Sequence, residues 1–226
     1  MSDLTANQLA ERLGITKRHA LNLLSTQAIA GRRLANGIWL ANSDAIARYE
    51  VNATRGSGRT LDTATAWGLL WELSGLEADW LSPSTRARVF RRIREADISM
   101  IASVVSKRTR AHRYTAANTE RAAANLIATG RTAAHLINSN LIEDRRHVCG
   151  YVRSGTVENY ARSHFMVAKE NGSDVLYDNT LPINYDASAM PPAVIAADLA
   201  RSTDTRERSA GLQSLERLRQ QWLAVR

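Results

Sequence analysis

The side chains best suited to chemistry lie near the start of the chain, on one face of an expected helix that runs from Thr16 to about Ala28. Apolar residues spaced as Ala20, Leu23 and Leu24 would be buried on the opposite face. The exposed face would carry cationic and hydrogen-bonding groups, namely Thr16, Lys17, Arg18, His19, Asn22 and Ser25. Groups of this kind contact phosphate oxygens and the base edges of a major groove. The pattern therefore predicts a DNA-recognition helix.

A second set of polar groups follows in an expected β-hairpin. The pair Asn36-Gly37 favours a tight type I′ turn, because both central residues of that turn need a positive φ. Arg32 and Arg33 precede the turn, and Ile38-Trp39-Leu40 follows it. A basic hairpin directly after a recognition helix is suited to reach a phosphate strand or a minor groove. We therefore predict that Arg32, Arg33 and Asn36 also contact DNA.

Local signals define the small domain that would hold these groups in place. Thr5 can cap a first helix, and Gln8 completes the spacing of a capping box. Gly14 can end that helix, since glycine tolerates the left-handed backbone found there. After the hairpin, Ser43 is expected to cap a short closing helix. Two helices around a glycine turn also occur in helical bundles, but the basic hairpin that follows favours a winged helix-turn-helix over residues 1–51.

The charge of the chain also favours a polyanionic partner, with a formal net charge of +8 over 226 residues. Residues 1–55 have an excess of three positive charges, and residues 83–113 have an excess of seven. The cations of this second basic segment are Arg86, Arg88, Arg91, Arg92, Arg94, Lys107, Arg108, Arg110 and Arg113. The segment could extend a nucleic-acid footprint, dock an acidic protein or form a solvated helix face. The excess of arginine over lysine favours binding, because a guanidinium group suits phosphate and carboxylate.

Composition predicts a linker over residues 52–61 and a C-terminal domain over residues 62–226. The linker is polar and contains Gly-Ser-Gly. Beyond it, expected helices alternate with short apolar strands, which predicts an α+β chain with a mixed α/β C-terminal domain. Trp67 and Trp71 share one face of the first helix in this region. They could stack on bases, but this spacing more often indicates a hydrophobic core.

Several segments of the C-terminal region have a definite expected structure. Helices are expected over Pro83–Ala96 and Asn118–Ala128, and Ser99–Val105 is expected to be a buried strand. A second strand is expected over His112–Thr115. The last helix, from Asp204 or Thr205, has an apolar stripe that could pack on the domain or against a second copy.

No arrangement of residues in the sequence indicates catalysis. His147 and Cys149 alternate along an expected strand, but two ligands do not make a zinc site. No nucleophile elbow, phosphate-binding glycine loop or cluster of metal-binding carboxylates is evident. Cys149 is the only cysteine, which excludes an internal disulfide and suits a reducing cytoplasm. We expect no enzymatic activity, no metal, no cofactor and no membrane span.

Three segments together resemble antitoxins of the AbiEi type. They are Trp80–Arg88, the basic turn into His112–Tyr114, and the ending Val194–Leu215, which includes Asp198 and Gly211. Antitoxins of this family accompany nucleotidyltransferase-like toxins in abortive-infection and toxin–antitoxin operons. The resemblance implies a DNA-binding head that represses the operon and a C-terminal domain that counters the toxin.

The leading hypothesis is thus a sequence-specific transcriptional repressor that is also an antitoxin. The partners expected are double-stranded DNA with an inverted-repeat operator, a cognate toxin and a second copy of the chain. One alternative is an excisionase-like phage or plasmid regulator without a toxin. Another is a nucleic-acid-processing enzyme that uses the head to reach its target.

Overall fold

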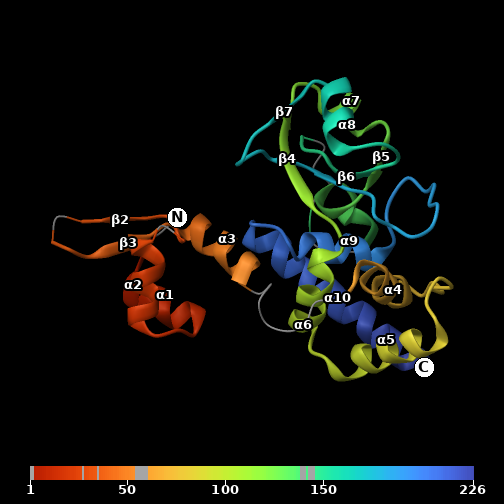
Figure 1. Ribbon diagram of the computed structural model, residues 1–226, viewed down its shortest axis with the longest axis horizontal. Helices are drawn as coiled ribbons and strands as arrows, with labels where there is room; N and C mark the ends of the chain where they lie inside the picture. Colours follow the sequence, from red (N-terminus) through yellow and green to blue (C-terminus); the bar gives the residue numbers. More distant parts are fainter. Residues whose placement is uncertain (1–2, 27, 35, 54–60, 138–140, 142–145) are drawn as a thin grey trace. The chain divides into compact units, whose positions relative to one another are not determined.

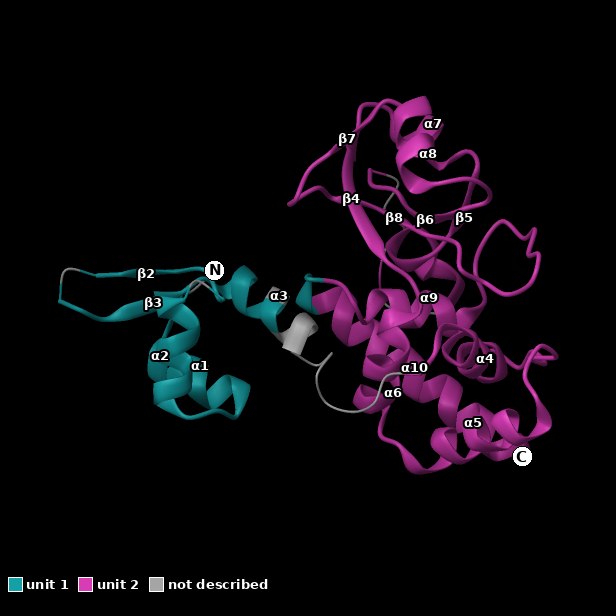
Figure 2. Cartoon of the chain, in the orientation of Figure 1, with its two compact units in different colours: residues 1–57, 203–205 teal, residues 58–202, 206–226 magenta. Residues whose placement is uncertain are grey.

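The computed structural model in Figure 1 describes residues 3–26, 28–34, 36–53, 61–137, 141 and 146–226. The chain is a mixed α+β protein with two sheets, so the predicted class is confirmed. It divides into two compact units, drawn in different colours in Figure 2. Unit 1 comprises residues 1–57 and 203–205, and unit 2 comprises residues 58–202 and 206–226. Of the predicted linker, residues 52 and 53 belong to a helix, residue 61 is described, and residues 54–60 lie outside the described part of the chain.

Unit 1 combines two helices, a hairpin and a closing helix. Its elements are β1 (Leu4–Thr5), α1 (Ala6–Leu13), α2 (Lys17–Ser25), β2 (Gly31–Arg33), β3 (Trp39–Ala41) and α3 (Ser43–Ala53). The three strands form one antiparallel sheet in the order β1-β3-β2. Leu9, Leu24 and Ile46 are fully buried at the centre of the unit. The unit therefore has a hydrophobic core of its own.

The helix ends of unit 1 follow from local side chains. Thr5 and Gln8 form the predicted capping box at the start of α1, and Gly14 ends that helix with a φ of 63°. The hydroxyl of Thr16 accepts a hydrogen bond from the N–H of His19 and caps α2. The prediction that α2 reaches Ala28 is wrong. The chain leaves the helix after Ser25, because Ile29 turns into the core and its N–H bonds to the carbonyl of Leu23.

The hairpin and the closing helix differ from the prediction in detail. The N–H of Leu34 donates to the carbonyl of Ile38 at 2.8 Å, so three residues rather than two form the loop. A three-residue loop of this kind needs a positive φ only at its last position, where Gly37 has a φ of 82°. The predicted type I′ turn is therefore wrong. Similarly, Asn42 rather than Ser43 caps α3, since Oδ1 of Asn42 accepts hydrogen bonds from the N–H groups of Asp44 and Ala45.

Unit 2 is built on a five-stranded sheet in the order β5-β6-β8-β4-β7. The β6–β8 pair is parallel and the other pairs are antiparallel. Before the sheet come α4 (Thr63–Leu73), α5 (Pro83–Glu95), α6 (Ile98–Val105) and the 3₁₀ helix η2 (Ser106–Arg108). The strands are β4 (Ala111–Ala116), β5 (Leu126–Ala128), β6 (Cys149–Val152), β7 (Met166–Ala168) and β8 (Asp174–Tyr177). The other helices are α7 (Thr119–Ala123), η3 (Gly130–Ile137), α8 (Val157–Ser163), α9 (Pro192–Leu199) and α10 (Thr205–Val225).

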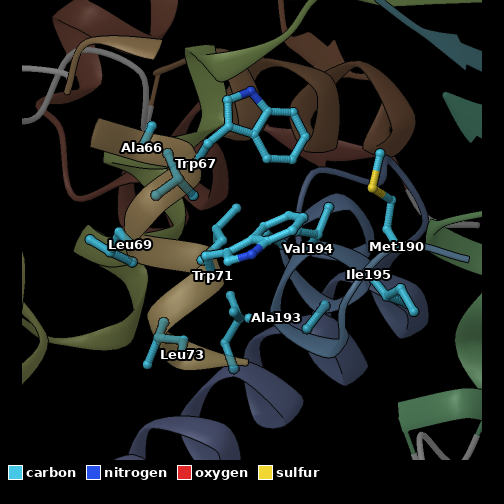
Figure 3. Close-up of a cluster of buried hydrophobic side chains, with 14 of the residues drawn as sticks. Ala66, Trp67, Leu69, Trp71, Leu73, Met190, Ala193, Val194 and Ile195 are labelled. Carbon is cyan, nitrogen blue, oxygen red and sulfur yellow. The ribbon is translucent and has the colours of Figure 1, made fainter. Parts of the chain in front are cut away.

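Both faces of this sheet are covered, because alternate strand residues belong to different cores. Leu126 and Leu176 pack with α7 and α8, whereas Ile127 and Tyr177 belong to a larger cluster with α4, α9 and α10. Figure 3 shows Trp67 and Trp71 of α4 within this larger cluster. Both indoles are buried, so the core interpretation of this pair is confirmed and a base-stacking platform is excluded.

The structure corrects two predicted elements. Ser99–Val105 is not a strand but most of α6, and Asp97 caps this helix through the N–H of Met100. A short apolar run does not by itself distinguish a buried strand from a buried helix. Asn118 caps a helix as predicted, but that helix ends at Ala123 and the chain continues as β5. Pairing of β5 with β6 outweighs the helical preference of the alanine-rich segment.

A charged network is buried at the centre of unit 2. Arg108 is 1% exposed, and its Nη2 lies 2.5 Å from Oδ1 of Asp198. Oδ2 of Asp198 accepts hydrogen bonds from the hydroxyls of Tyr151 at 2.9 Å and Thr129 at 2.8 Å. Burial alone would lower the pKa of Arg108, but Asp198, Tyr151 and Tyr177 together outweigh this effect and raise the pKa above its ordinary value. The network ties η2 to α9 and to the sheet.

Removing one partner of this pair is expected to destabilise unit 2 strongly. The Asp198→Ala variant should lose about 3–5 kcal/mol of unfolding free energy, because it leaves a guanidinium group buried without its counter-charge. The double variant Arg108→Met/Asp198→Leu should recover a large part of that loss, since neither charge then remains. Urea unfolding followed by tryptophan fluorescence measures both. Equal losses in the two variants would contradict the expectation.

The single thiol is expected to be inert in the folded protein. Cys149 is buried, and this burial raises the pKa of its thiol to about 12. The thiolate, which is the reactive form, is therefore scarce at pH 8. We expect the native protein to react with Ellman's reagent only as fast as it unfolds, and at full stoichiometry in urea. Rapid labelling without denaturant would show that the side chain is accessible.

Candidate nucleic-acid interface

The helix α2 presents a polar face because its apolar residues are used in the core of unit 1. Ala20, Leu23 and Leu24 are buried, whereas the predicted contact residues on this helix remain exposed. Those residues are Lys17, Arg18, His19, Asn22 and Ser25, with Thr16 at the cap. The helical period thus separates a buried face from a face rich in hydrogen-bonding groups.

The register of the hairpin decides which arginine faces the same way as α2. Arg33 lies opposite Trp39 and Arg32 lies opposite Leu40. Successive side chains of a strand point to opposite faces, so the Arg33–Trp39 pair and the Arg32–Leu40 pair face different sides. Arg33 and Trp39 turn toward α2. The two elements together border an open hollow of about 910 Å³, lined by Thr16, Arg18, His19, Leu21, Asn22, Ser25, Arg33, Gly37 and Trp39.

The hollow brings together six of the nine residues predicted to bind DNA: Thr16, Arg18, His19, Asn22, Ser25 and Arg33. The other three lie elsewhere. Lys17 is exposed on α2 outside the hollow, and Arg32 lies on the other hairpin face with its Nη2 3.3 Å from Oδ2 of Asp3. Asn36 lies in the loop, where its Oδ1 accepts from the N–H of Ile38 at 3.2 Å.

Sequence reasoning missed Leu21, Gly37 and Trp39 as lining residues. Trp39 could have been found from the hairpin register, which places it opposite Arg33. That register depends on the loop length, and the loop has three residues rather than the two that were expected. Leu21 is a half-buried apolar residue of α2 next to the polar face, and its position gives no sequence signal for binding.

The hollow is electropositive. Its lining contains Arg18 and Arg33 and no aspartate or glutamate. Within the described residues, no carboxylate forms an ion pair with either of these arginines, although Nε of Arg33 donates a long hydrogen bond of 3.4 Å to the carbonyl of Gly37. Two cations without counter-charges, surrounded by hydroxyl, amide and imidazole groups, suit a phosphate-bearing ligand.

In the second basic segment, Arg86 and Arg108 are used to hold unit 2 together. Nε of Arg86 lies 2.6 Å from Oε1 of the buried Glu72, and its Nη2 lies 3.5 Å from Glu77. Arg108 is buried against Asp198, so its assignment to a binding surface is wrong. The physical reason is that a buried carboxylate requires a counter-charge, which the sequence alone does not reveal.

Two further arginines of this segment also contact groups of unit 2. The guanidinium of Arg94 lies 5.5 Å from the ring centre of Trp222, and Nη1 of Arg113 donates to the carbonyl of Gly172 at 3.1 Å. The three arginines Arg88, Arg91 and Arg92 line a separate cavity of about 520 Å³ in which Asp62, Glu95 and Asp97 offset their charge. Lys107 and Arg110 are exposed. The nine cations therefore do not form one common site.

No other part of the described chain assembles a recognisable reactive centre. Within the described residues, no group of three or more His, Cys, Asp or Glu side chains is placed to hold a metal ion. Asp174 is buried and accepts hydrogen bonds from the N–H groups of Ala116 and Val148, which is a structural role. Among the helices of the described segments, none is both long and apolar enough to cross a membrane.

In comparisons with known proteins, no family model matches the chain, and no curated protein or solved structure matches it.

Proposed function

We propose that this protein is a sequence-specific regulator that binds double-stranded DNA through a winged helix-turn-helix in unit 1. The observation that supports this most directly is the hollow between α2 and the β2–β3 hairpin. It gathers six of the predicted contact residues, including Arg18 and Arg33, without a carboxylate. Repression of its own operon, in the cytoplasm, is the form of regulation that we propose.

The width of α2 and the residues around the hollow suggest how DNA would be bound. A helix is about 10–12 Å across with its side chains, which fits the roughly 12 Å width of a major groove. With α2 in the groove, the adjacent sugar–phosphate strand would occupy the hollow. Arg18 would then approach that strand from α2 and Arg33 from the hairpin, while His19 and Asn22 face the base edges. Phosphate contacts would fix the register, and base contacts would supply specificity.

Binding of an inverted repeat requires two copies of unit 1. Heads that read successive major grooves on one side of a duplex lie roughly 34–36 Å apart. We propose that two copies of the chain bind such an operator, each with one α2.

The antitoxin role is proposed on the resemblance to AbiEi-type antitoxins. Residues within the matching segments have structural roles in unit 2. Ser82 caps α5, Asp198 is part of the buried network, and a Cβ on Gly211 would lie 2.4 Å from the backbone nitrogen of Ala200. The matching residues therefore support a shared fold for unit 2 more directly than a shared toxin-binding surface. A neighbouring reading frame of nucleotidyltransferase type would favour the antitoxin role over the excisionase-like alternative.

Removal of the two arginines of the hollow is expected to weaken DNA binding. The Arg18→Ala/Arg33→Ala variant should bind the DNA upstream of its reading frame at least about tenfold more weakly, with the slope of log K against log salt reduced by about two. Gel shifts at several salt concentrations measure this. The variant Arg162→Ala/Lys169→Ala, which removes two exposed cations from unit 2, serves as the matched control. Equal binding by both variants would refute the assignment of the hollow.

Repression and protection from a toxin are expected to separate genetically. In cells that carry the adjacent toxin, the Arg18→Ala/Arg33→Ala variant should lose repression of a promoter reporter and still protect growth, because both substitutions lie in unit 1. The Asp198→Ala variant should lose protection, because the substitution destabilises the fold of unit 2. If the first variant loses protection at wild-type protein levels, neutralisation depends on DNA binding and the proposed division of roles is wrong.

A further inference from the structure

The strand β7 of unit 2 has one edge without a neighbouring strand, since it is the last strand of the five-stranded sheet (Figure 1). The N–H of Lys169 donates to the carbonyl of Arg113 at 3.1 Å, so Lys169 and Val167, two positions apart, bond toward β4. The backbone groups of Met166 and Ala168 therefore point away from β4. No described residue forms a hydrogen bond with them there. The open edge thus offers two N–H donors and two carbonyl acceptors.

The opposite edge of the same sheet is partly covered. Ala128 of β5 forms a parallel bridge with Ala189. The N–H of Ala128 donates to the carbonyl of Ser188 at 2.9 Å, and the carbonyl of Ala128 accepts from the N–H of Met190 at 2.8 Å. Open strand edges readily pair with other chains, and proteins commonly cover them. The described part of the chain supplies such a cover at β5 and none at β7.

Two large apolar side chains are exposed along the open edge. Phe165 is 65% exposed and Val167 is 69% exposed, and neither is among the residues packed on the adjacent core. Phe165 directly follows the C-terminal cap of α8 with a φ of 54°, a backbone conformation that favours glycine. Neither burial nor backbone conformation therefore explains a phenylalanine at this position. A binding partner that covers the ring would explain it.

The charged groups around this edge are mainly cationic. The guanidinium of Arg121 lies 5.0 Å from the ring centre of Phe165. Arg162 and Lys169 flank the strand, whereas Glu170 is the only carboxylate between positions 162 and 170. The three cations are exposed, and within the described residues none of them forms an ion pair. A segment that matches this excess of positive charge carries carboxylates.

We propose that the open edge of β7 binds an extended, acidic segment of a partner protein as an additional strand. The backbone of the segment bonds to the N–H and carbonyl groups of Met166 and Ala168. An apolar residue of the segment packs on Phe165 and Val167, and its carboxylates lie near the three cations. DNA binding is not required for this interaction, because every residue of the edge belongs to unit 2.

The probe for this interaction is a peptide selected on the full-length protein from a phage-displayed library of short random linear sequences. We expect the selected sequences to carry more Asp and Glu than Lys and Arg. They should also alternate apolar with polar residues, because the two faces of a docked strand have different surroundings. A synthetic peptide of the consensus sequence is titrated by fluorescence polarisation. Hydrogen exchange should show protection of the Met166 and Ala168 amides in the complex.

N-methylation of the peptide distinguishes a docked strand from other modes of binding. A strand bonds to an edge through every second residue, so only one of the two alternate sets of peptide nitrogens supplies donors. Methyl groups on that set should weaken binding at least about tenfold, which corresponds to roughly 1.4 kcal/mol. Methyl groups on the other set should leave the affinity unchanged. Equal affinities of the two methylated peptides would exclude a docked strand.

A variant without the aromatic ring tests the contribution of the side chain. Phe165→Gly should bind the peptide about tenfold more weakly. Its thermal unfolding temperature should stay the same or rise, because glycine adopts a φ of 54° without strain. The control variant Leu136→Ala, which shortens an exposed leucine elsewhere in unit 2, should bind like the wild type. Wild-type affinity of Phe165→Gly would contradict the proposal.

Three further outcomes would also overturn it. If no sequence is enriched, the edge does not accept a strand. Peptides that Phe165→Gly still binds and Arg18→Ala/Arg33→Ala does not would occupy the hollow of unit 1 instead. A concentration-dependent dimer that Phe165→Gly abolishes would identify a second copy, rather than a partner protein, as the occupant. Gel shifts measure DNA binding separately, so the proposed function is tested independently of all three.

Discussion

The ion pair between Arg108 and Asp198 is the constraint on which unit 2 depends. Both side chains are buried, and their charges are tolerable only because each neutralises the other and because Tyr151 and Thr129 satisfy the remaining oxygen. These four residues come from η2, α9, the sheet and the segment after β5. Elements far apart in the chain must therefore meet at one point with little freedom. A cation that sequence reasoning assigned to a surface instead specifies how the interior is arranged.

In unit 1, the register of one short hairpin decides which side chains face α2. Alternation along β2 and β3 directs Arg33 and Trp39 to one side and Arg32 to the other. Leu34 and Ile38 extend the second face beyond the last paired residues. A shift of register by one residue would exchange these faces. The three-residue loop ending in Gly37 is what fixes the register, so a conformational property of glycine determines which groups accompany α2.

Features encoded by neighbouring residues could be predicted, and features that depend on distant residues could not. The capping box of Thr5 and Gln8 and the start of α5 at Pro83 need only a few residues, and both were found from the sequence. The helical period is also local, and the exposed face of α2 that carries Arg18, His19 and Asn22 was found from it. The helix at Ser99–Val105, the strand β5 and the burial of Arg108 depend on cores and pairings that a single segment does not reveal. The predicted two-residue loop of the hairpin was wrong although its signal is local, because Asn-Gly suits more than one loop length.

The buried position of Cys149 excludes one way of joining two copies of this protein. With its only thiol buried and protonated, the chain has no means of covalent cross-linking through sulfur. Two heads on an inverted repeat would then be brought together by mass action alone. Occupancy of such an operator rises with about the square of protein concentration at low occupancy. Under the proposed function, operator occupancy would therefore depend on the abundance of the protein rather than on the oxidation state of the cell.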